Sequence, residues 1–348
     1  MVTQKEIAEF VGLDRSMVAH ALRGDPRVAE ATRLRVIKAA REMGYDSFSN
    51  GAARSLAAQR HGKRVKTGTI AILMLDLFEG MPMVDVPFFQ EILSGIIHAA
   101  HERDLELSIC VTPLGKLPRA VVEGNVDGAL CIYDIELWKL LCQQPLPIPI
   151  LNLGAAAPGE PAILPDDRQG IRATTRHLIE AGHRRIAYVG DYQLEASWME
   201  RLAGYRQALE QADIEVDETL MAIDIGAPSQ RAGVAGFDTL QRRGVDFSAV
   251  VCFNDQSALG VIQRAQECGY RVPDDLSVAG FDGISETFGE GKTLTTARFD
   301  RFEMGRCAVR RLYRTEADNT VEIMPTELVV GDSTKPWRDS QTSNRRDL

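Results

Sequence analysis

The sequence predicts an α/β protein in which a small all-α head precedes a body of two doubly wound parallel sheets. Three observations lead to this prediction. Signals that start and stop helices follow one another closely in the first 45 residues. From Thr69 onward, short apolar runs alternate with amphipathic stretches of helical period. The charge also differs between the two parts, because residues 1–66 carry a balance of +6 and the remainder a balance of −15.

Capping signals define three short helices in the head. Thr3 and Glu6 form a capping box, in which each side chain accepts a hydrogen bond from the other residue's main-chain N–H, and Gly12 ends this first helix. Asp14 caps a second helix, and a third runs from about Glu30 to Met43. Helical spacing predicts a buried apolar face formed by Ile7, Ala8, Phe10, Val11, Met17, Val18, Ala21, Leu22, Leu34, Val36, Ile37 and Ala40.

Two short helices around a tight glycine turn, backed by a third helix, indicate a helix-turn-helix motif over residues 1–47. In this motif the second helix enters the major groove of DNA, where exposed side chains near its start reach the base edges. Arg15, Ser16 and His20 are predicted on the outer face of that helix. A generic three-helix bundle with a solvated basic face is the alternative. The agreement of turn, caps and positive charge favours DNA binding, and the acidic body would be repelled by phosphates.

The body alternates buried strands with helices. Apolar runs predict parallel strands at Ile70–Leu75, Leu107–Val111, Gly128–Ile132, Ile148–Asn152, Arg185–Val189, Ala249–Phe253 and Leu276–Phe281. Helical patterns lie between them at Phe89–Arg103, Gly170–Ala181, Met199–Ala212, Gly233–Arg243 and Asp255–Cys268. This number of strands suffices for two doubly wound subdomains.

Short motifs occur in a characteristic order along nearly the whole chain. The head contains Lys5-Glu6-Ile7-Ala8, Gly12-Leu13, Arg27-Val28, Thr32-Arg33 and Glu42-Met43-Gly44-Tyr45, followed by Asn50-Gly51-Ala52-Ala53-Arg54-Ser55-Leu56. The body contains Gly182-His183-Arg184-Arg185-Ile186-Ala187-Tyr188-Val189-Gly190, Phe253-Asn254-Asp255, Leu276-Ser277-Val278-Ala279-Gly280-Phe281-Asp282 and Leu294-Thr295-Thr296. Single motifs are weak signals, but the ordered set resembles the LacI/GalR family of bacterial transcription regulators.

The resemblance implies that residues 48–66 form a hinge helix and linker, which folds when two subunits meet on DNA. It also implies that Leu56 wedges into the minor groove at the centre of the operator and kinks it. An ordinary apolar residue in an alanine-rich linker is the alternative for Leu56. The expected DNA-contacting residues are Thr3, Arg15, Ser16, His20, Arg27, Thr32, Asn50, Ala53, Arg54 and Leu56.

The recognition helix departs from the family pattern. His20 stands where a long cation is usual, and histidine is only partly charged near neutral pH. The connection from Tyr45 to Asn50 is also longer than usual and lacks the customary proline. The operator sequence therefore cannot be copied from relatives. Arg15 is a candidate for the bidentate contact with guanine O6 and N7.

For the body, the resemblance implies a core like that of the periplasmic sugar-binding proteins, with chain crossings near Asp166, Leu294 and Glu322. The N-subdomain would comprise 67–165 and 294–321, the C-subdomain 166–293 and 322–334, and a polar tail 335–348. An effector would lie between the subdomains, at the carboxyl ends of the strands. Arg201 offers a guanidinium fork for hydroxyl or carboxylate groups, and Asp255 a carboxylate after a buried strand. The expected effector-binding residues are Asp76, Phe88, Ser197, Trp198, Arg201, Asp255 and Asp282.

Some interpretations stay open at this point. Trp198 could present a flat face to a sugar ring or anchor the core. The segment 76–89 is longer than in relatives and could extend the cleft or pack at a subunit interface. We expect a repressor controlled by a sugar or sugar-like effector, with an activator as the alternative. Whether the effector acts as an inducer or as a corepressor is not decided by the sequence. The tail lacks leucine heptads, so we expect a homodimer and not a tetramer held by a coiled coil.

Composition argues against several other classes of protein. The hydrophobic and charged fractions of 45% and 26% are ordinary for a folded protein, and no apolar run is long enough to span a membrane. The N-terminus MVTQKEIAEF does not resemble a signal peptide, so a cytoplasmic location is expected and a free solute-binding protein is disfavoured. The six cysteines have no metal-type spacing, and no catalytic motif is recognisable. We expect no enzymatic activity, no metal and no cofactor.

Overall fold

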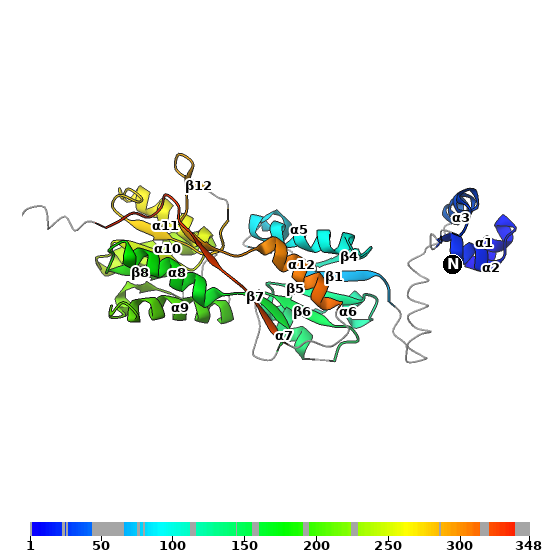
Figure 1. Ribbon diagram of the computed structural model, residues 1–348, viewed down its shortest axis with the longest axis horizontal. Coiled ribbons are helices and arrows are strands. Elements are labelled where there is room, and N and C mark those ends of the chain that lie inside the picture. The colour runs from blue at the N-terminus through cyan, green and yellow to red at the C-terminus, as the bar shows by residue number, and fades with distance from the viewer. Residues whose placement is uncertain are drawn as a thin grey trace, which may run out of the picture. The chain divides into compact units, whose positions relative to one another are not determined.

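The computed structural model describes residues 2–22, 25, 27–43, 66–74, 77–78, 81–111, 116–143, 145–154, 160–190, 195–223, 229–284, 287–313 and 320–337. The chain separates into two compact units, Met1–Thr67 and Gly68–Leu348, called the head and the body below (Figure 1). Each unit has an apolar core of its own.

The head contains the three predicted helices, α1 (Gln4–Val11), α2 (Arg15–Leu22) and α3 (Glu30–Glu42). The capping box at Thr3 is present, and Gly12 ends α1 in the left-handed conformation at φ 65°. The core is formed chiefly by Ile7, Val18 and Val36, which are all fully buried. The helix-turn-helix order predicted from the caps is therefore present.

Part of the predicted apolar face of the head was wrong. Phe10 is 62% exposed, Leu34 60% and Met17 37%. The core of three short helices is small, so helical spacing alone overstates how many apolar side chains it can cover.

The first subdomain of the body contains a six-stranded parallel sheet. Its strand order is β15-β7-β6-β5-β1-β4, with β15 (Val321–Met324), β7 (Ala162–Pro165), β6 (Ile150–Leu153), β5 (Gly128–Ile132), β1 (Thr69–Met74) and β4 (Glu106–Val111). On one face, Ile70 and Ile72 belong to the same apolar cluster as residues of α5 (Pro87–His101) and α12 (Arg301–Leu312). On the other face, Ala71 and Leu73 pack with α6 (Arg119–Val122) and α7 (Ile135–Cys142).

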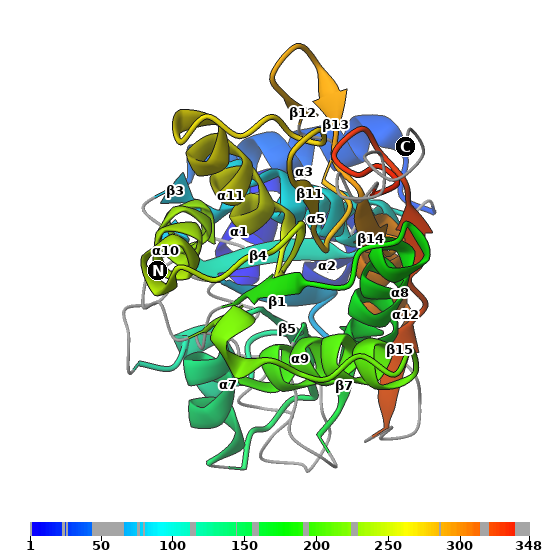
Figure 2. The ribbon, with the colours of Figure 1, turned by 90° about the vertical axis from the view of Figure 1, so that its left-hand side faces the viewer.

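The second subdomain contains a four-stranded parallel sheet. Its order is β11-β10-β8-β9, with β11 (Ser277–Ala279), β10 (Ala249–Cys252), β8 (Ile186–Val189) and β9 (Met221–Ala222). Figure 2 shows α8 (Asp167–Glu180) and α9 (Glu195–Glu210) on one side of this sheet, and α10 (Ser229–Arg243) and α11 (Asp255–Glu267) on the other. Tyr188 faces the first pair of helices, and Val189 faces the second pair.

Three segments of the chain pass between the two subdomains (Figure 1). The first joins β7 to α8 at Asp166, the position expected from the sequence for one of the chain crossings. The second joins β14 (Thr296–Arg298) to α12, a few residues after the expected crossing at Leu294, because Thr295 is still bridged to Ala279 of the second sheet. The third joins β15 to β16 (Glu327–Val329), after Met324 and not at Glu322, because Glu322 pairs with Ile163 in the first sheet. β14 and β16 pair antiparallel beside the joint.

The body continues past the predicted boundary at residue 334. The N–H of Trp337 donates a 2.7 Å hydrogen bond to the oxygen of Ala181, and the Trp337 ring lies 5.6 Å from the ring of His183. Residues 335–337 therefore pack on the second subdomain, whereas 338–348 lie outside the described residues. Two short hairpins, β2 (Leu77–Phe78) with β3 (Met81–Pro82) and β12 (Thr287–Phe288) with β13 (Lys292–Thr293), complete the body.

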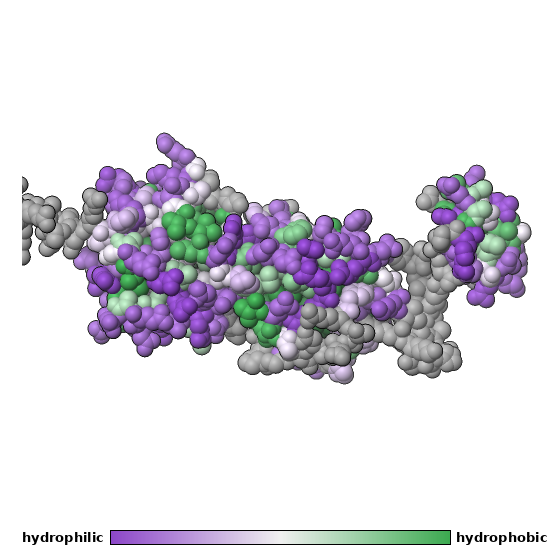
Figure 3. All heavy atoms as spheres, in the orientation of Figure 1, coloured by the Kyte–Doolittle hydropathy of each residue, from purple (hydrophilic) through white to green (hydrophobic). Residues whose placement is uncertain are grey.

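Hydrophilic side chains cover most of the face of the body shown in Figure 3, and apolar side chains gather in a few smaller patches. Among the helices that the structure describes, none has both the length and the apolar character that crossing a membrane requires.

Candidate effector site and DNA-contacting surface

A buried guanidinium lies at the centre of the candidate effector site. Arg201 on α9 is only 2% exposed. Its Nε donates to Oδ1 of Asp167 at 2.7 Å, and Nη1 donates to the oxygen of Phe253 at 2.7 Å. Its guanidinium also stacks on two aromatic rings, at 4.4 Å from the centre of Phe253 and 3.9 Å from that of Phe281. Arg201 is therefore held in one orientation from several sides.

Two further carboxylates belong to this cluster, of which Asp282 contacts Arg201 and Asp255 interacts with Asp282. Asp282 Oδ1 is 3.7 Å from Nη2 of Arg201. Asp255 is fully buried, and it accepts hydrogen bonds from Oγ1 of Thr296 at 2.6 Å and from the N–H of Ile284 at 2.9 Å. Asp255 and Asp282 follow neighbouring parallel strands, β10 and β11, whose carboxyl ends meet at the same edge of the sheet. The structure thus brings three predicted effector-binding residues together.

Burial controls the ionisation of this cluster. It raises the pKa of Asp255 to about 6 and that of Asp282 to about 8, although Arg201 and Arg301 act in the opposite direction on Asp282. Burial also raises the pKa of Asp167, against the attraction of Arg201. For Arg201, burial opposes the charged form, but Asp167 and Asp282 more than offset it and its pKa is raised. Arg201 therefore favours the charged forms of Asp167 and Asp282, whereas Arg301 does so for Asp255.

Arg301 joins the two subdomains, although no motif in the sequence marks it as a site residue. It opens α12 of the first subdomain and is 2% exposed. Its guanidinium donates to the main-chain oxygen of Asp282 and, at 3.1 Å, to that of Gly283, both in the second subdomain. It also donates from Nε to Oε2 of Glu91 on α5 at 3.0 Å. The position of Asp282 therefore depends on contacts from both subdomains.

Aromatic side chains form the wall of the cluster on the side of the first subdomain. Phe88, a predicted site residue, lies 5.1 Å from Tyr133 and 6.0 Å from Phe299, measured between ring centres. Ser197, on α9 of the second subdomain, donates from Oγ to the oxygen of Gly154 in the first subdomain at 3.2 Å. Phe88 and Ser197 thus lie at the boundary between the subdomains. Their contact with an effector remains a prediction.

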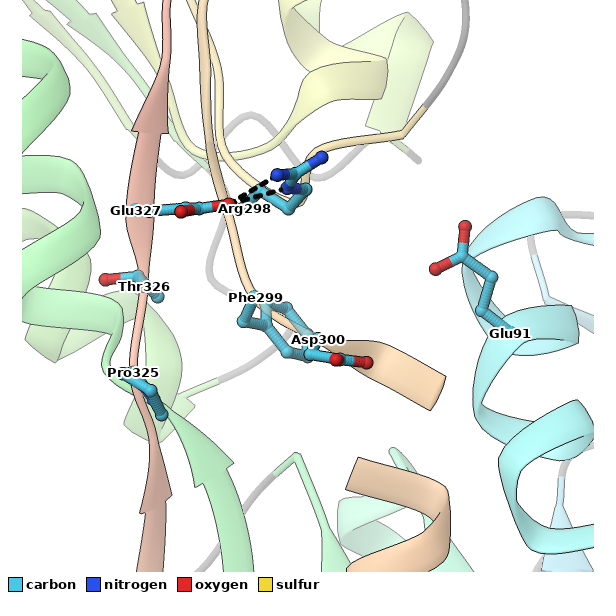
Figure 4. Close-up of a pocket in the computed structure, with 7 residues that line it drawn as sticks. All are labelled: Glu91, Arg298, Phe299, Asp300, Pro325, Thr326 and Glu327. Carbon is cyan, nitrogen blue, oxygen red and sulfur yellow. Dashed lines mark hydrogen bonds and ion pairs between the residues drawn. The ribbon is translucent and has the colours of Figure 1, made fainter. Parts of the chain in front are cut away.

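A cavity of about 480 Å³ lies beside the crossing segments. Figure 4 shows Glu91 on α5 facing the two crossing strands, whose Arg298 and Glu327 form an ion pair with an Nε–Oε1 distance of 3.1 Å. Its lining residues are Glu91, Arg298, Phe299, Asp300, Pro325, Thr326 and Glu327. Because its walls come from both subdomains, any rotation of one against the other changes its width.

The head presents some of the predicted DNA-contacting residues to solvent. Arg15 and Ser16, at the start of α2, are exposed. Asp14 caps α2, because its Oδ1 accepts a 2.8 Å hydrogen bond from the N–H of Met17. Thr3 and Arg27 are exposed as well, and Thr32 is half-buried.

Asp25 was not identified from the sequence, although it contacts two of the predicted DNA-binding side chains. It accepts from Nη2 of Arg27 at 2.7 Å, and its Oδ2 lies 2.8 Å from Nδ1 of His20. The hydrogen bonds from Arg27 and His20 hold the pKa of Asp25 well below its usual range. The one available signal was its place two residues before Arg27, within reach of an aspartate side chain.

Several predicted site residues lie outside the described residues. These are Asn50, Ala53, Arg54 and Leu56 of the hinge, Asp76, and the side chain of Trp198. Among the described residues there is no group of three or more histidine, cysteine, aspartate or glutamate side chains that could hold a metal ion.

Comparisons with known proteins agree with this architecture. Residues 175–334 match a family model described as a periplasmic binding protein-like domain. The chain is 30% identical to the HTH-type transcriptional repressor PurR of Vibrio atlanticus over 331 residues, which cover 92% of this chain and 94% of that protein. It is also 30% identical to the HTH-type transcriptional regulator CelR of Thermobifida fusca over 344 residues, 95% of this chain and 98% of that one.

Two solved structures resemble the fold over nearly the full length. A complex of the transcriptional regulator CelR with cellobiose has a TM-score of 0.66 at 26% identity, covering 96% of this chain and all of that chain. The lac repressor dimer bound to operator and the anti-inducer ONPF has a TM-score of 0.74 at 22% identity, covering 96% of this chain and 99% of that one. The likeness therefore includes both the head and the body.

Proposed function

The chain belongs to the LacI/GalR family of transcription regulators, and on this premise we propose that it binds a palindromic operator as a homodimer under the control of a small-molecule effector. The effector is a sugar or sugar-like molecule, bound between the two subdomains of the body. The protein acts on transcription as a repressor and carries out no chemical reaction itself.

One observation carries the effector part of this proposal. Arg201, Asp255 and Asp282 converge, almost completely buried, at the carboxyl ends of the strands of the second subdomain. Buried charged groups are costly to stability, so a cluster of this kind at the joint between subdomains suggests a binding role. The relative CelR was solved with cellobiose, which supports a carbohydrate as the class of ligand.

The DNA-binding part rests on the head. The exposed Arg15 and Ser16 start the second helix of a helix-turn-helix, the position from which side chains read bases in the major groove. In the proposed mechanism, effector binding changes the angle between the subdomains and so the spacing of the two hinge segments in the dimer. When the hinges meet and fold, Leu56 from each subunit enters the minor groove at the centre of the operator.

The test is selection of the purified full chain on randomised and genomic DNA at two salt concentrations, followed by sequencing. A palindrome with a central pyrimidine–purine step is the expected result, because such steps kink easily. Binding that is salt-sensitive but has no sequence motif would contradict operator recognition, since contacts with phosphates alone carry no sequence information.

Two variants assign roles within the operator. Arg15→Ala should relax the preference at one base pair of each half-site, and Lys38→Ala on α3, which removes an equal charge, should leave every preference unchanged. Leu56→Ala should weaken operator binding strongly. If Leu56→Ala binds the operator as tightly as the wild type does, Leu56 does not insert into the minor groove. This result would not contradict base recognition by side chains of α2.

A further inference from the structure

Tyr133 has an unusual conformation at the boundary between the subdomains. It directly follows β5, at the carboxyl end of a central strand of the first sheet, and its backbone has φ 49°. This left-handed conformation is unfavourable for a residue with a bulky side chain. Packing holds it in place: the ring lies so close to Gly154 that a Cβ on that glycine would be 2.2 Å from the Tyr133 Cζ. The chain therefore keeps Tyr133 in this position against its backbone preference.

The hydroxyl of Tyr133 is buried and has no hydrogen-bond partner in the part of the chain that the structure describes. The residue as a whole is 6% exposed. A buried hydroxyl without a partner lowers stability, so proteins rarely retain one without a functional reason. Tyr205 is the contrasting case, because it is also buried, at 1% exposed, but its hydroxyl donates to the oxygen of Ile186 at 2.8 Å.

The surroundings of this hydroxyl are those of the candidate effector site. Burial, followed by the negative charge of Asp167, raises the pKa of Tyr133, while Arg201 and Arg301 act to lower it. The Tyr133 ring packs edge-on against Phe88 at 5.1 Å. Tyr188 at the end of β8, on the other subdomain, has a second unpartnered buried hydroxyl, on which Arg201 and Asp167 also act.

We propose that Tyr133 is a further effector-binding residue, whose hydroxyl forms a hydrogen bond with a polar atom of the effector. The inference rests on the proposed effector role of the cleft. In the aromatic wall formed by Phe88, Tyr133 and Phe299, the hydroxyl of Tyr133 is a polar group without a partner in the described residues. A hydrogen bond with the effector would give it one. Tyr133 would then fix the orientation of a ligand that Arg201 and Asp282 contact from the second subdomain.

The charges around Tyr133 also indicate the class of ligand. The buried cluster holds three carboxylates, Asp167, Asp255 and Asp282, against the two guanidiniums of Arg201 and Arg301. Because the pKa of Asp282 is raised to about 8, this carboxyl is mostly protonated near neutral pH, and the two remaining carboxylates balance the two guanidiniums. The cluster therefore has no uncompensated positive charge for an anionic ligand in a poorly hydrated site. The rings of Phe88, Phe281 and Phe299 offer apolar faces. These features fit an uncharged ring compound with hydroxyl or amide groups at its edge.

The first experiment compares the thermal unfolding of the full-length variants Tyr133→Phe and Tyr205→Phe. Tyr133→Phe removes an unpaired polar atom. Its unfolding midpoint should therefore lie between that of the wild type and a value about 2 °C higher. Tyr205→Phe removes a paired hydroxyl, so its midpoint should fall by about 2 °C or more. A fall in Tyr133→Phe as large as that in Tyr205→Phe would mean that the hydroxyl has a partner in the protein, and would overturn the inference.

The second experiment measures binding by calorimetry to mono- and disaccharides, including cellobiose and ribose, and to free purine bases. For the compound that binds wild type most tightly, Tyr133→Phe should weaken affinity by about tenfold or more, with Tyr205→Phe unchanged. Equal affinity of Tyr133→Phe and wild type contradicts the role of Tyr133 but leaves the effector site standing. If none of these compounds binds wild type, the proposed effector class fails, and the role of Tyr133 fails with it.

Discussion

The guanidinium of Arg301 donates a hydrogen bond to the main-chain oxygen of Asp282, although the two residues belong to different subdomains. The same guanidinium is anchored on its own subdomain by Glu91 at 2.9 Å. Asp282 itself has φ 130°, a conformation that non-glycine residues rarely adopt. The first subdomain thus holds a strained residue of the second in place.

Arg301→Met should therefore loosen the two subdomains relative to each other. The variant removes the hydrogen bonds to Asp282 and Gly283, so the distribution of distances between the subdomains should broaden or shift. The distances can be measured by single-molecule energy transfer between dyes on Cys142 of the first subdomain and Cys268 of the second, which are both exposed. Labelled protein is diluted into an excess of unlabelled protein so that energy transfer occurs only within one chain, whatever its oligomeric state.

The matched control for this measurement is Arg298→Met. Arg298 precedes Arg301 by three residues, but it is 54% exposed and pairs with Glu327 on the adjacent strand of the same joint. Its removal should leave the distance distribution unchanged. The partly buried Cys110 and Cys307 are replaced by serine in all samples to prevent additional labelling. A distribution in Arg301→Met that matches the control contradicts the role of Arg301 as a link.

Arg201→Met should be strongly destabilising. The substitution leaves Asp167 buried without its charged partner, which typically costs about 3–5 kcal/mol of unfolding free energy. Urea denaturation of the full chain measures this loss. The control is Arg168→Met, whose half-exposed ion pair with Glu200 should contribute less than about 1 kcal/mol. Similar small losses in both variants would show that Arg201 does not compensate the buried carboxylates.

Asp282 should make stability depend on pH. Because burial raises its pKa from 3.8 to about 8, the folded protein binds this proton more tightly than the unfolded chain does. The resulting stabilisation is complete below pH 3.8 and is lost as the pH rises through about 8. Unfolding midpoints in urea between pH 5 and 9 should therefore decrease less in Asp282→Asn than in wild type.

Asp274→Asn serves as the control for the pH measurement. Asp274 is exposed and pairs with Lys335 at 2.7 Å, which lowers its pKa, so its proton binding hardly changes above pH 5. This variant should follow the wild-type pH dependence. If Asp282→Asn also follows it, Asp282 is already ionised throughout the range and the predicted coupling is absent.

Asp14→Ala should loosen the second helix of the head. The change removes the acceptor for the N–H of Met17 at the start of α2. Hydrogen exchange of the Met17 amide in the full chain should accelerate by about fivefold, and Asp14→Ser, which preserves an acceptor, should restore most of the protection. An equal acceleration in Asp14→Ser would locate the effect in the charge of Asp14 and not in its capping bond.

Local structure could be predicted from the sequence because its causes are local. The capping box of Thr3 and Glu6 involves residues three positions apart, and the apolar runs of β1 and β5 bury both of their faces. The short strands β7 and β15 were missed. Ala162–Pro165 ends in a proline, and Val321–Met324 contains a glutamate and is largely exposed at the sheet edge. Such strands are held by their neighbours in the sheet more than by their own pattern.

The candidate site was predicted in part. Arg201, Asp255 and Asp282 could be proposed because motifs and strand ends mark them individually. Which groups they meet was decided by the tertiary structure, since Arg201 pairs with Asp167, and Arg301 reaches Glu91 from a distance of 210 positions along the chain. The unpartnered hydroxyl of Tyr133 also has no signal in the sequence.

The sequence by itself therefore determined the helices of the head, the alternation of strands and helices in the body and the family. The tertiary structure decided where the chain crosses between subdomains, which apolar side chains of the head are covered, and which charges share the buried cluster. The physical reason is that capping and periodicity depend on neighbouring residues, whereas burial and ion pairing depend on groups that only folding brings together.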